Sequence, residues 1–163
     1  MIRAILMAGL LLAASPASAA RESLGVFDGW GSFRDDRPTR CFAVAEPVVR
    51  RGGGDWRPFA SISFWPARAV RGQIHIRLRR AKLPGAPVTL AIGDRRFALI
   101  GGGGDAWAPD PRTDATIVAA MRSGTSLSVE TRARDGRAFV DAYRLRGAAT
   151  AIDAAALGCA RRG

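Results

Sequence analysis

The sequence predicts an all-β fold, a single-domain β-sandwich with two short helices that occupies residues 20–163. Short runs of alternating apolar and polar residues follow one another, separated by glycine and proline, which is the rhythm of sandwiches and barrels. Long helical segments of the kind that connect parallel strands do not separate these runs, so the pattern disfavours a βαβ architecture. The chain of 163 residues also has the length of one domain.

The first nineteen residues have the pattern of a signal peptide. Arg3 supplies a positive charge, residues 5–14 form an apolar run, and Ala17-Ser18-Ala19 offers small residues at a cleavage site. The apolar run is about ten residues long, against the roughly twenty that a membrane-spanning helix needs, and no later segment comes closer. We therefore expect a periplasmic or secreted mature chain without a transmembrane segment. The alternative is a cytosolic protein that retains this segment as a helix.

Seven runs have the composition of β-strands. The clearest is 73–79, where Ile74, Ile76 and Leu78 point to one face while His75 and Arg77 point to the other. Glycine at the start of Gly93-Asp94-Arg95 and the pair Asp135-Gly136 predict tight hairpin turns. The predicted strands are 40–46, 59–65, 73–79, 88–92, 96–100, 126–134 and 137–146.

Two short helices complete the prediction. Asp114 is placed to cap a helix over residues 115–123, which carries an apolar stripe and ends before Gly124. Thr150 and Asp153 have capping-box spacing around a second helix over 152–157.

Cys41 and Cys159 are the only cysteines. An even number of cysteines in an exported chain predicts a disulfide, here one that closes a loop of over a hundred residues. The chain-entropy model assigns such a bond about 4–5 kcal/mol of stability. With two cysteines and a single histidine, the sequence predicts no metal site and no cofactor.

Positive charge dominates the predicted mature chain. Removal of Arg3 leaves 24 basic and 14 acidic residues, a formal charge of +10, and Lys82 is the only lysine. Such an excess favours anionic partners, although a solvated basic exterior would give the same composition.

Four arginines are the candidate anion-binding residues: Arg77, Arg79, Arg144 and Arg146. They come from two predicted strands, and they would form one basic patch if those strands share a face of the sheet. Guanidinium groups bind phosphate and sulfate bidentately, so the expected partners are lipopolysaccharide, anionic lipid headgroups or host glycans. Nucleic acid is disfavoured, because the arginine runs lack interleaved aromatic residues and no nucleic-acid-binding motif is present.

Catalytic chemistry has little support in the sequence. His75 is the only histidine and has no serine or aspartate at a motif spacing, which predicts a surface histidine. The glycine run 101–104 is followed by Asp105 and Pro109 and not by a helix, so it predicts a flexible hairpin end and not a phosphate cradle. Trp30 is expected in the core.

Trp56 and Trp65 are the two tryptophans that could serve as exposed stacking platforms, but core or edge packing is the favoured interpretation of both.

Several short motifs together resemble the invasion-associated locus B family of bacterial envelope and secreted proteins. They are Phe27-Asp28-Gly29-Trp30, Arg40-Cys41-Phe42-Ala43, Leu83-Pro84-Gly85, Met121-Arg122-Ser123-Gly124 and Tyr143-Arg144-Leu145-Arg146-Gly147. The chain departs from the family in having Phe33 where a cysteine is usual and in lacking a central cysteine pair. The resemblance implies a β-sandwich in the periplasm or outside the cell, sometimes linked to host-cell entry, and it brings no catalytic residues.

The interpretation that follows is an exported, non-enzymatic interaction protein of the bacterial envelope with a basic face for anionic partners. Two alternatives stay open: a small secreted hydrolase whose site is not visible in the sequence, and an inhibitor or accessory module that docks on another envelope protein. Clustered arginines would favour the first interpretation. A pocket with His75 and a carboxylate would favour the hydrolase, and an exposed apolar patch around Trp56 and Trp65 the docking module.

Overall fold

The computed structural model describes residues 21–48, 54 and 56–160. The predicted signal peptide and its cleavage site lie outside the described residues. Ten strands and two α-helices make up the described part, so the mostly β fold with two helices is confirmed. The strands are β1 Arg21–Phe27, β2 Trp30–Asp36, β3 Thr39–Ala45, β4 Phe59–Trp65, β5 Val70–Arg77, β6 Val88–Ile92, β7 Arg95–Gly102, β8 Asp105–Trp107, β9 Ser126–Arg132 and β10 Ala138–Arg144.

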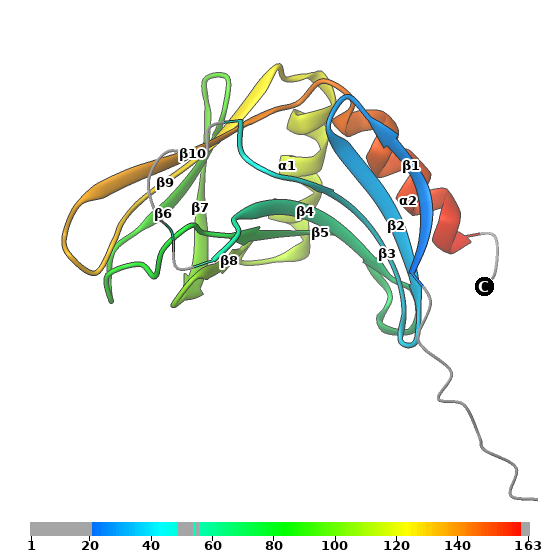
Figure 1. The fold of residues 1–163 in the computed structure, drawn as a ribbon, viewed down its shortest axis with the longest axis horizontal. Helices are drawn as coiled ribbons and strands as arrows, with labels where there is room; N and C mark the ends of the chain where they lie inside the picture. The colour runs from blue at the N-terminus through cyan, green and yellow to red at the C-terminus, as the bar shows by residue number, and fades with distance from the viewer. Residues whose placement is uncertain (1–20, 49–53, 55, 161–163) are drawn as a thin grey trace, which may run out of the picture.

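All strand pairs are antiparallel, and the spatial order is β1-β2-β3-β4-β5-β8-β7-β6-β9-β10. The sheet is strongly curved (Figure 1). One half of the sheet contains β1–β5 and β8, the other contains β6, β7, β9 and β10, and the short pairing of β7 with β8 makes them one continuous sheet. Both halves contribute side chains to one hydrophobic core, which makes the fold sandwich-like.

One face of the sheet is covered by helix α1, Pro111–Ser123, and helix α2, Ala148–Ala160. The alternation predicted for residues 73–79 holds, because Ile74 and Ile76 are fully buried on this face. Ile117 of α1 and Ile152 of α2 belong to the same core. Trp30 is buried as predicted, and its Nε1 donates a hydrogen bond to the backbone carbonyl of β10, 2.8 Å away.

The predicted cap of the first helix is wrong. The helix begins at Pro111, and Asp110 is the cap, accepting a hydrogen bond from the Thr113 amide at 2.8 Å. Proline fits the first helical position because that position needs no intrahelical N–H donor. Asp114 instead lies inside the helix, is buried, and accepts a 2.8 Å hydrogen bond from the Ile74 amide. Burial raises the pKa of the Asp114 carboxyl.

The second helix is longer than the predicted 152–157, since it runs from Ala148 to Ala160. Its additional residues are mostly alanine, which has the highest helix propensity and lets the helix approach the sheet closely. Gly158 does not end the helix: a side chain there would collide with Leu24, and its carbonyl accepts a 2.8 Å hydrogen bond from Arg34. The helix is thus tied to β2 near its C-terminus.

Strands β1 and β2 were not among the predicted strands, because their sequences do not alternate cleanly. The signal that could have found them is the Asp28-Gly29 turn, where both residues have positive φ, as a two-residue hairpin requires. The glycine run 101–104 is a hairpin end, as predicted, and connects β7 to β8. The late hairpin is present as β9 and β10, each shorter than predicted.

A disulfide joins Cys41 and Cys159, as predicted, with a Cα–Cα distance of 5.7 Å. It links β3 to the last turn of α2 on the helix-covered face and is buried against Ala155 and Phe64. None of the described helices is long and apolar enough to cross a membrane.

Candidate functional site

Two of the four candidate anion-binding arginines come from one stretch of chain and are both held by carboxylates. Arg77 forms an ion pair with Asp105 of β8. The Arg79 Nε lies 2.5 Å from Asp141, a fully buried residue of β10. Buried carboxylates need such partners, so Arg79 has a structural task in joining β10 to the chain that follows β5.

The other two candidate arginines lie near the end of β10. Arg144 is exposed on the face of this strand opposite to Tyr143 and Asp141, whereas Arg79 contacts the Asp141 side. The Arg146 Nε lies 3.3 Å from Asp28, in the turn between β1 and β2. The four side chains therefore do not form one patch that faces a single way. Anion binding by any of them stays a prediction.

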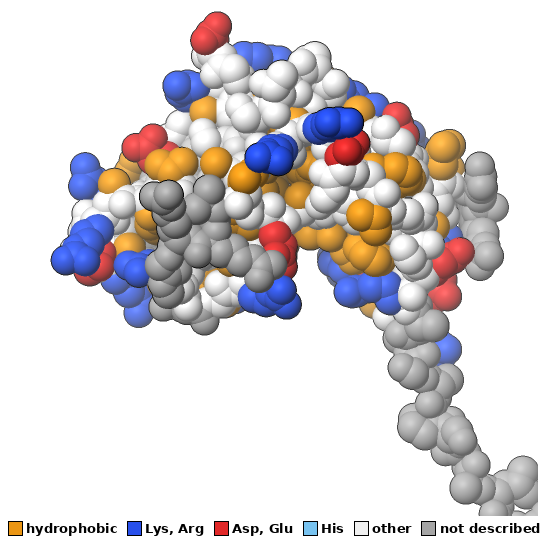
Figure 2. Space-filling model, turned by 45° about the horizontal axis from the view of Figure 1, so that its top comes forward, with side chains coloured by type: hydrophobic (Ala, Val, Ile, Leu, Met, Phe, Trp, Pro, Cys, Tyr) orange, Lys and Arg blue, Asp and Glu red, His pale blue; other side chains and the backbone are white. Residues whose placement is uncertain are grey.

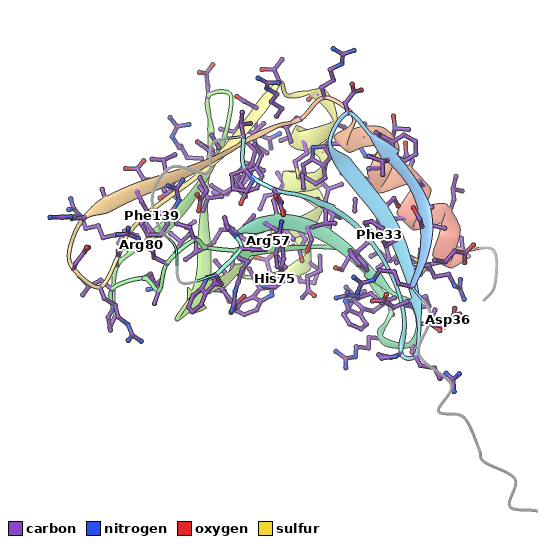
Figure 3. All side chains as sticks on the ribbon, in the orientation of Figure 1. Phe33, Asp36, Arg57, His75, Arg80 and Phe139 are labelled. Carbon is purple, nitrogen blue, oxygen red and sulfur yellow. A yellow bond between two sulfur atoms is a disulfide. The ribbon has the colours of Figure 1, made fainter. Side chains whose placement is uncertain are left out.

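A different surface gathers aromatic and basic side chains. We call it the open face: the side chains of β1–β5 and β8 that point away from α1 and α2. Strand register aligns them in rows across the sheet. The open face consists of Arg21, Ser23, Val26, Phe33, Asp35, Arg40, Phe42, Val44, Phe59, Ser61, Ser63, Trp65, Gln73, His75, Arg77, Asp105 and Trp107. Phe33 and His75 are labelled in Figure 3.

The open face has two hollows at its ends. One, of about 460 Å³, is lined mainly by apolar side chains, among them Val26, Phe33 and Phe59, with Arg57 and Glu46 at its rim. The Arg57 Nη2 lies 3.1 Å from Glu46. The other hollow, of about 370 Å³, is lined by Arg21, Asp35, Arg37, Pro38, Arg40 and Trp65. Figure 2 shows hydrophobic and basic side chains side by side on the molecular surface.

His75 lies near the middle of the open face and has partners that its sequence neighbourhood did not reveal. Its ring stacks on Trp107 at 5.1 Å between centroids and meets the edge of Phe59 at the same distance. Its Nε2 lies 2.8 Å from the Asp105 carboxylate. The side chain is half-buried, so the simple surface histidine expected from the sequence is replaced by an oriented imidazole.

A histidine–aspartate pair orients an imidazole for proton transfer, which is two-thirds of a nucleophilic triad. Ser61 lies opposite His75 in the strand register. Within the described structure, however, no hydrogen bond joins the two side chains. Among the described residues the hydrogen-bond partner of the imidazole is the Asp105 carboxylate, so the arrangement does not present an activated nucleophile.

Trp56 and Trp65, for which the sequence favours core or edge packing over exposure, are half-buried, and each stacks with arginine. The Arg77 guanidinium lies 4.3 Å from the Trp56 ring, whose Nε1 donates to the Leu78 carbonyl. Arg40 covers Trp65 at 5.1 Å. Arginine and aromatic residues are therefore interleaved in space although they are not interleaved in the sequence.

The fold has a solved counterpart. Invasion associated protein B from Bartonella henselae superposes with a TM-score of 0.59 over 84% of this chain and 98% of that chain, at 17% sequence identity. The resemblance seen in the sequence thus extends to the fold. No protein-family model and no curated protein matches the sequence.

Proposed function

We propose that this protein is an exported, periplasmic or secreted, non-enzymatic interaction protein of the bacterial envelope. Its open face binds an anionic partner, a component of the envelope or of a host-cell surface. The observation that carries the proposal is a sheet face across six strands that neither helix covers and that presents aromatic and arginine side chains together.

The composition of the open face is that of a recognition surface. Protein interfaces are enriched in aromatic residues and arginine and depleted in lysine. Val26 is 70% exposed, and Ile100, which continues the row of His75 and Trp107 on β7, is 55% exposed. They are two of the six exposed large hydrophobic side chains among the described residues. Apolar side chains left in water on one surface favour a partner that covers them.

Two further features support export and an envelope role. A disulfide is typical of proteins that fold in an oxidising compartment, and the sequence before Ala20 has the pattern of a signal peptide. The fold neighbour is an invasion-associated protein, which supports a link of this chain to host interaction within the same proposal.

The experiment measures binding of the purified mature protein to lipopolysaccharide and its dependence on salt. Val26→Asp places a carboxylate on the open face, and Ile100→Asp places one on β7, in the row that continues this face, where they remove apolar contact and repel an anion. We expect binding to weaken by at least about tenfold, which corresponds to about 1.4 kcal/mol. The matched control is Val140→Asp with Leu157→Asp, two exposed apolar residues away from the open face. Equal losses in both variants, or no loss in the first, would overturn the proposal.

A second candidate function is a small hydrolase, which the His75–Asp105 pair favours. A screen with ester, amide and glycoside substrates tests it. Activity that His75→Ala abolishes, with the folded state intact by circular dichroism, would replace the interaction-protein proposal.

A further inference from the structure

Three arginines stack on two aromatic rings at one end of the open face, and we call this set the arginine ladder. The guanidinium groups of Arg21 and Arg40 lie 5.2 and 4.1 Å from the centroid of the Phe42 ring. Arg40 and Arg68 each lie 5.1 Å from the centroid of Trp65. Stacking on a ring holds a guanidinium by its face and leaves its N–H donors free at the edge.

Asp35 orients the first part of the ladder. Its carboxylate lies 2.8 Å from the Arg21 Nε and 3.0 Å from the Arg40 Nη2. The hydrogen bond from Arg21 lowers the pKa of the Asp35 carboxyl, so it is ionised at neutral pH. One carboxylate thus holds two guanidinium groups in place next to the hollow of about 370 Å³.

The ladder region keeps unpaired positive charge. No carboxylate in the described part of the chain pairs with Arg37 or Arg68. Arg37 lines the hollow, whose walls contribute three arginines and one carboxylate. This contrasts with Arg77 and Arg79, each of which already has a carboxylate partner. The site therefore has donors ready for an anion that Arg77 and Arg79 do not have.

We infer that this hollow binds an anionic saccharide, a sugar that carries a carboxylate, sulfate or phosphate. Arg37 and Arg40, which line the hollow, hold the anionic group together with Arg68, which stacks on Trp65 beside it. Trp65 packs against the sugar ring. A volume of about 370 Å³ lies at the small end of ligand sites, the size of one or two sugar rings. The inference rests on the proposed function and assigns that function a ligand class and a location.

The geometry favours a saccharide over single-stranded nucleic acid. Nucleic-acid platforms stack successive bases on open aromatic faces. Here Phe42 is 6% exposed, and arginines lie over both Phe42 and Trp65, so the ladder has no row of open rings. Trp65 lines the hollow and is the ring of the ladder that a ligand there contacts. One ring beside several guanidinium groups suits a single sugar with its acidic substituent.

The test measures the affinity of the mature protein for a heparin-derived octasaccharide by titration calorimetry at several salt concentrations. Arg37→Glu with Arg68→Glu reverses two charges that hold no described carboxylate. We expect affinity to fall by more than about tenfold, because charge-assisted contacts to an anion are lost. The slope of log affinity against log salt should shrink by about two, by analogy with other polyanions. Trp65→Leu should weaken binding, and Trp65→Phe should restore most of it.

The matched control is Arg134→Glu with Arg137→Glu, which reverses two exposed arginines on the late hairpin. If the control loses as much affinity as Arg37→Glu with Arg68→Glu, net charge alone determines octasaccharide binding, and the inference is overturned. Tighter binding of a single-stranded oligonucleotide of equal charge would overturn it as well.

Failure of the inference and failure of the proposed function give different results. Suppose that Val26→Asp with Ile100→Asp abolishes lipopolysaccharide binding while Arg37→Glu with Arg68→Glu leaves the octasaccharide affinity unchanged. The proposed function is then supported and the saccharide site is refuted. If only Arg37→Glu with Arg68→Glu loses octasaccharide affinity, and Val26→Asp with Ile100→Asp keeps its lipopolysaccharide binding, the saccharide site is supported and the proposal for the whole open face is refuted. Circular dichroism and melting curves verify that each variant is folded.

Discussion

Removal of the disulfide should cost this protein a large part of its stability. Cys41 and Cys159 are separated by 118 positions, so the bond closes nearly the whole domain into one loop. The chain-entropy relation for a loop of this length gives about 4–5 kcal/mol at 25 °C. Domains of ordinary stability have about 5–15 kcal/mol in total, so the double variant Cys41→Ala with Cys159→Ala should be close to unfolding at 37 °C. Both sulfurs are buried, which adds a small packing loss to the entropic one.

Urea unfolding followed by tryptophan fluorescence measures the effect, since Trp30 is buried in the core. The reduced wild-type protein should unfold at nearly the same urea concentration as the double variant, because both lack the same cross-link. A difference below about 1 kcal/mol between the oxidised protein and the double variant would refute the reasoning. Quantitative alkylation of both cysteines in protein from its native compartment would show that the bond is absent there.

Three further predictions concern single side chains. Burial raises the pKa of Asp114, so its native pKa lies above the unfolded value of about 3.9. As pH rises from the unfolded pKa through the native one, the free energy of unfolding of the wild type, measured by urea titration, should fall relative to that of Asp114→Asn. His75→Ala should destabilise by about 1 kcal/mol in the same assay, more than an ordinary surface substitution, because it removes the stack on Trp107. Gly147→Ala should lower the melting temperature far more than Gly136→Ala: both glycines have positive φ, but only at Gly147 would a side chain meet backbone, at 2.1 Å.

Each of these has a contradicting result. A pH-independent difference between Asp114→Asn and the wild type would show that the carboxyl is not perturbed by burial. A neutral His75→Ala would mean that the imidazole stack contributes nothing. Equal melting temperatures for the two glycine variants would show that positive φ, and not the close approach, controls the loss.

The face of each residue could be predicted from the sequence, but its neighbours across the sheet could not. The alternation of 73–79 placed Ile74 in the core and His75 on the opposite side, and both placements hold. The contact of His75 with Asp105 depends on the pairing of β5 with β8, thirty positions apart, and no local pattern encodes it.

The same limit applies to the basic residues. Arg40 and Phe42 alternate on β3, which was a local signal for a shared face. Arg21 reaches Phe42 only through strand register, whereas Arg68 stacks on Trp65, three positions before it in the chain. The four arginines chosen from the sequence belonged to charge-rich runs, and charge density does not show which of them has a carboxylate partner. For the cap of the first helix, in contrast, the local sequence held enough information. Asp110 and Asp114 both precede the apolar stripe, and Pro111, at the first helical position, identifies Asp110 as the cap.

The central claim is that the open face is the surface that a partner covers. Hydroxyl-radical footprinting of the mature protein, with and without saturating heparin-derived octasaccharide, measures this directly. The account predicts that Trp65, Phe33 and Trp107 are protected on binding, Trp65 most strongly because it lines the hollow. Leu157 of α2, which is 53% exposed, should react equally in both states. Protection of Leu157 together with unchanged reactivity of Trp65 would contradict the account.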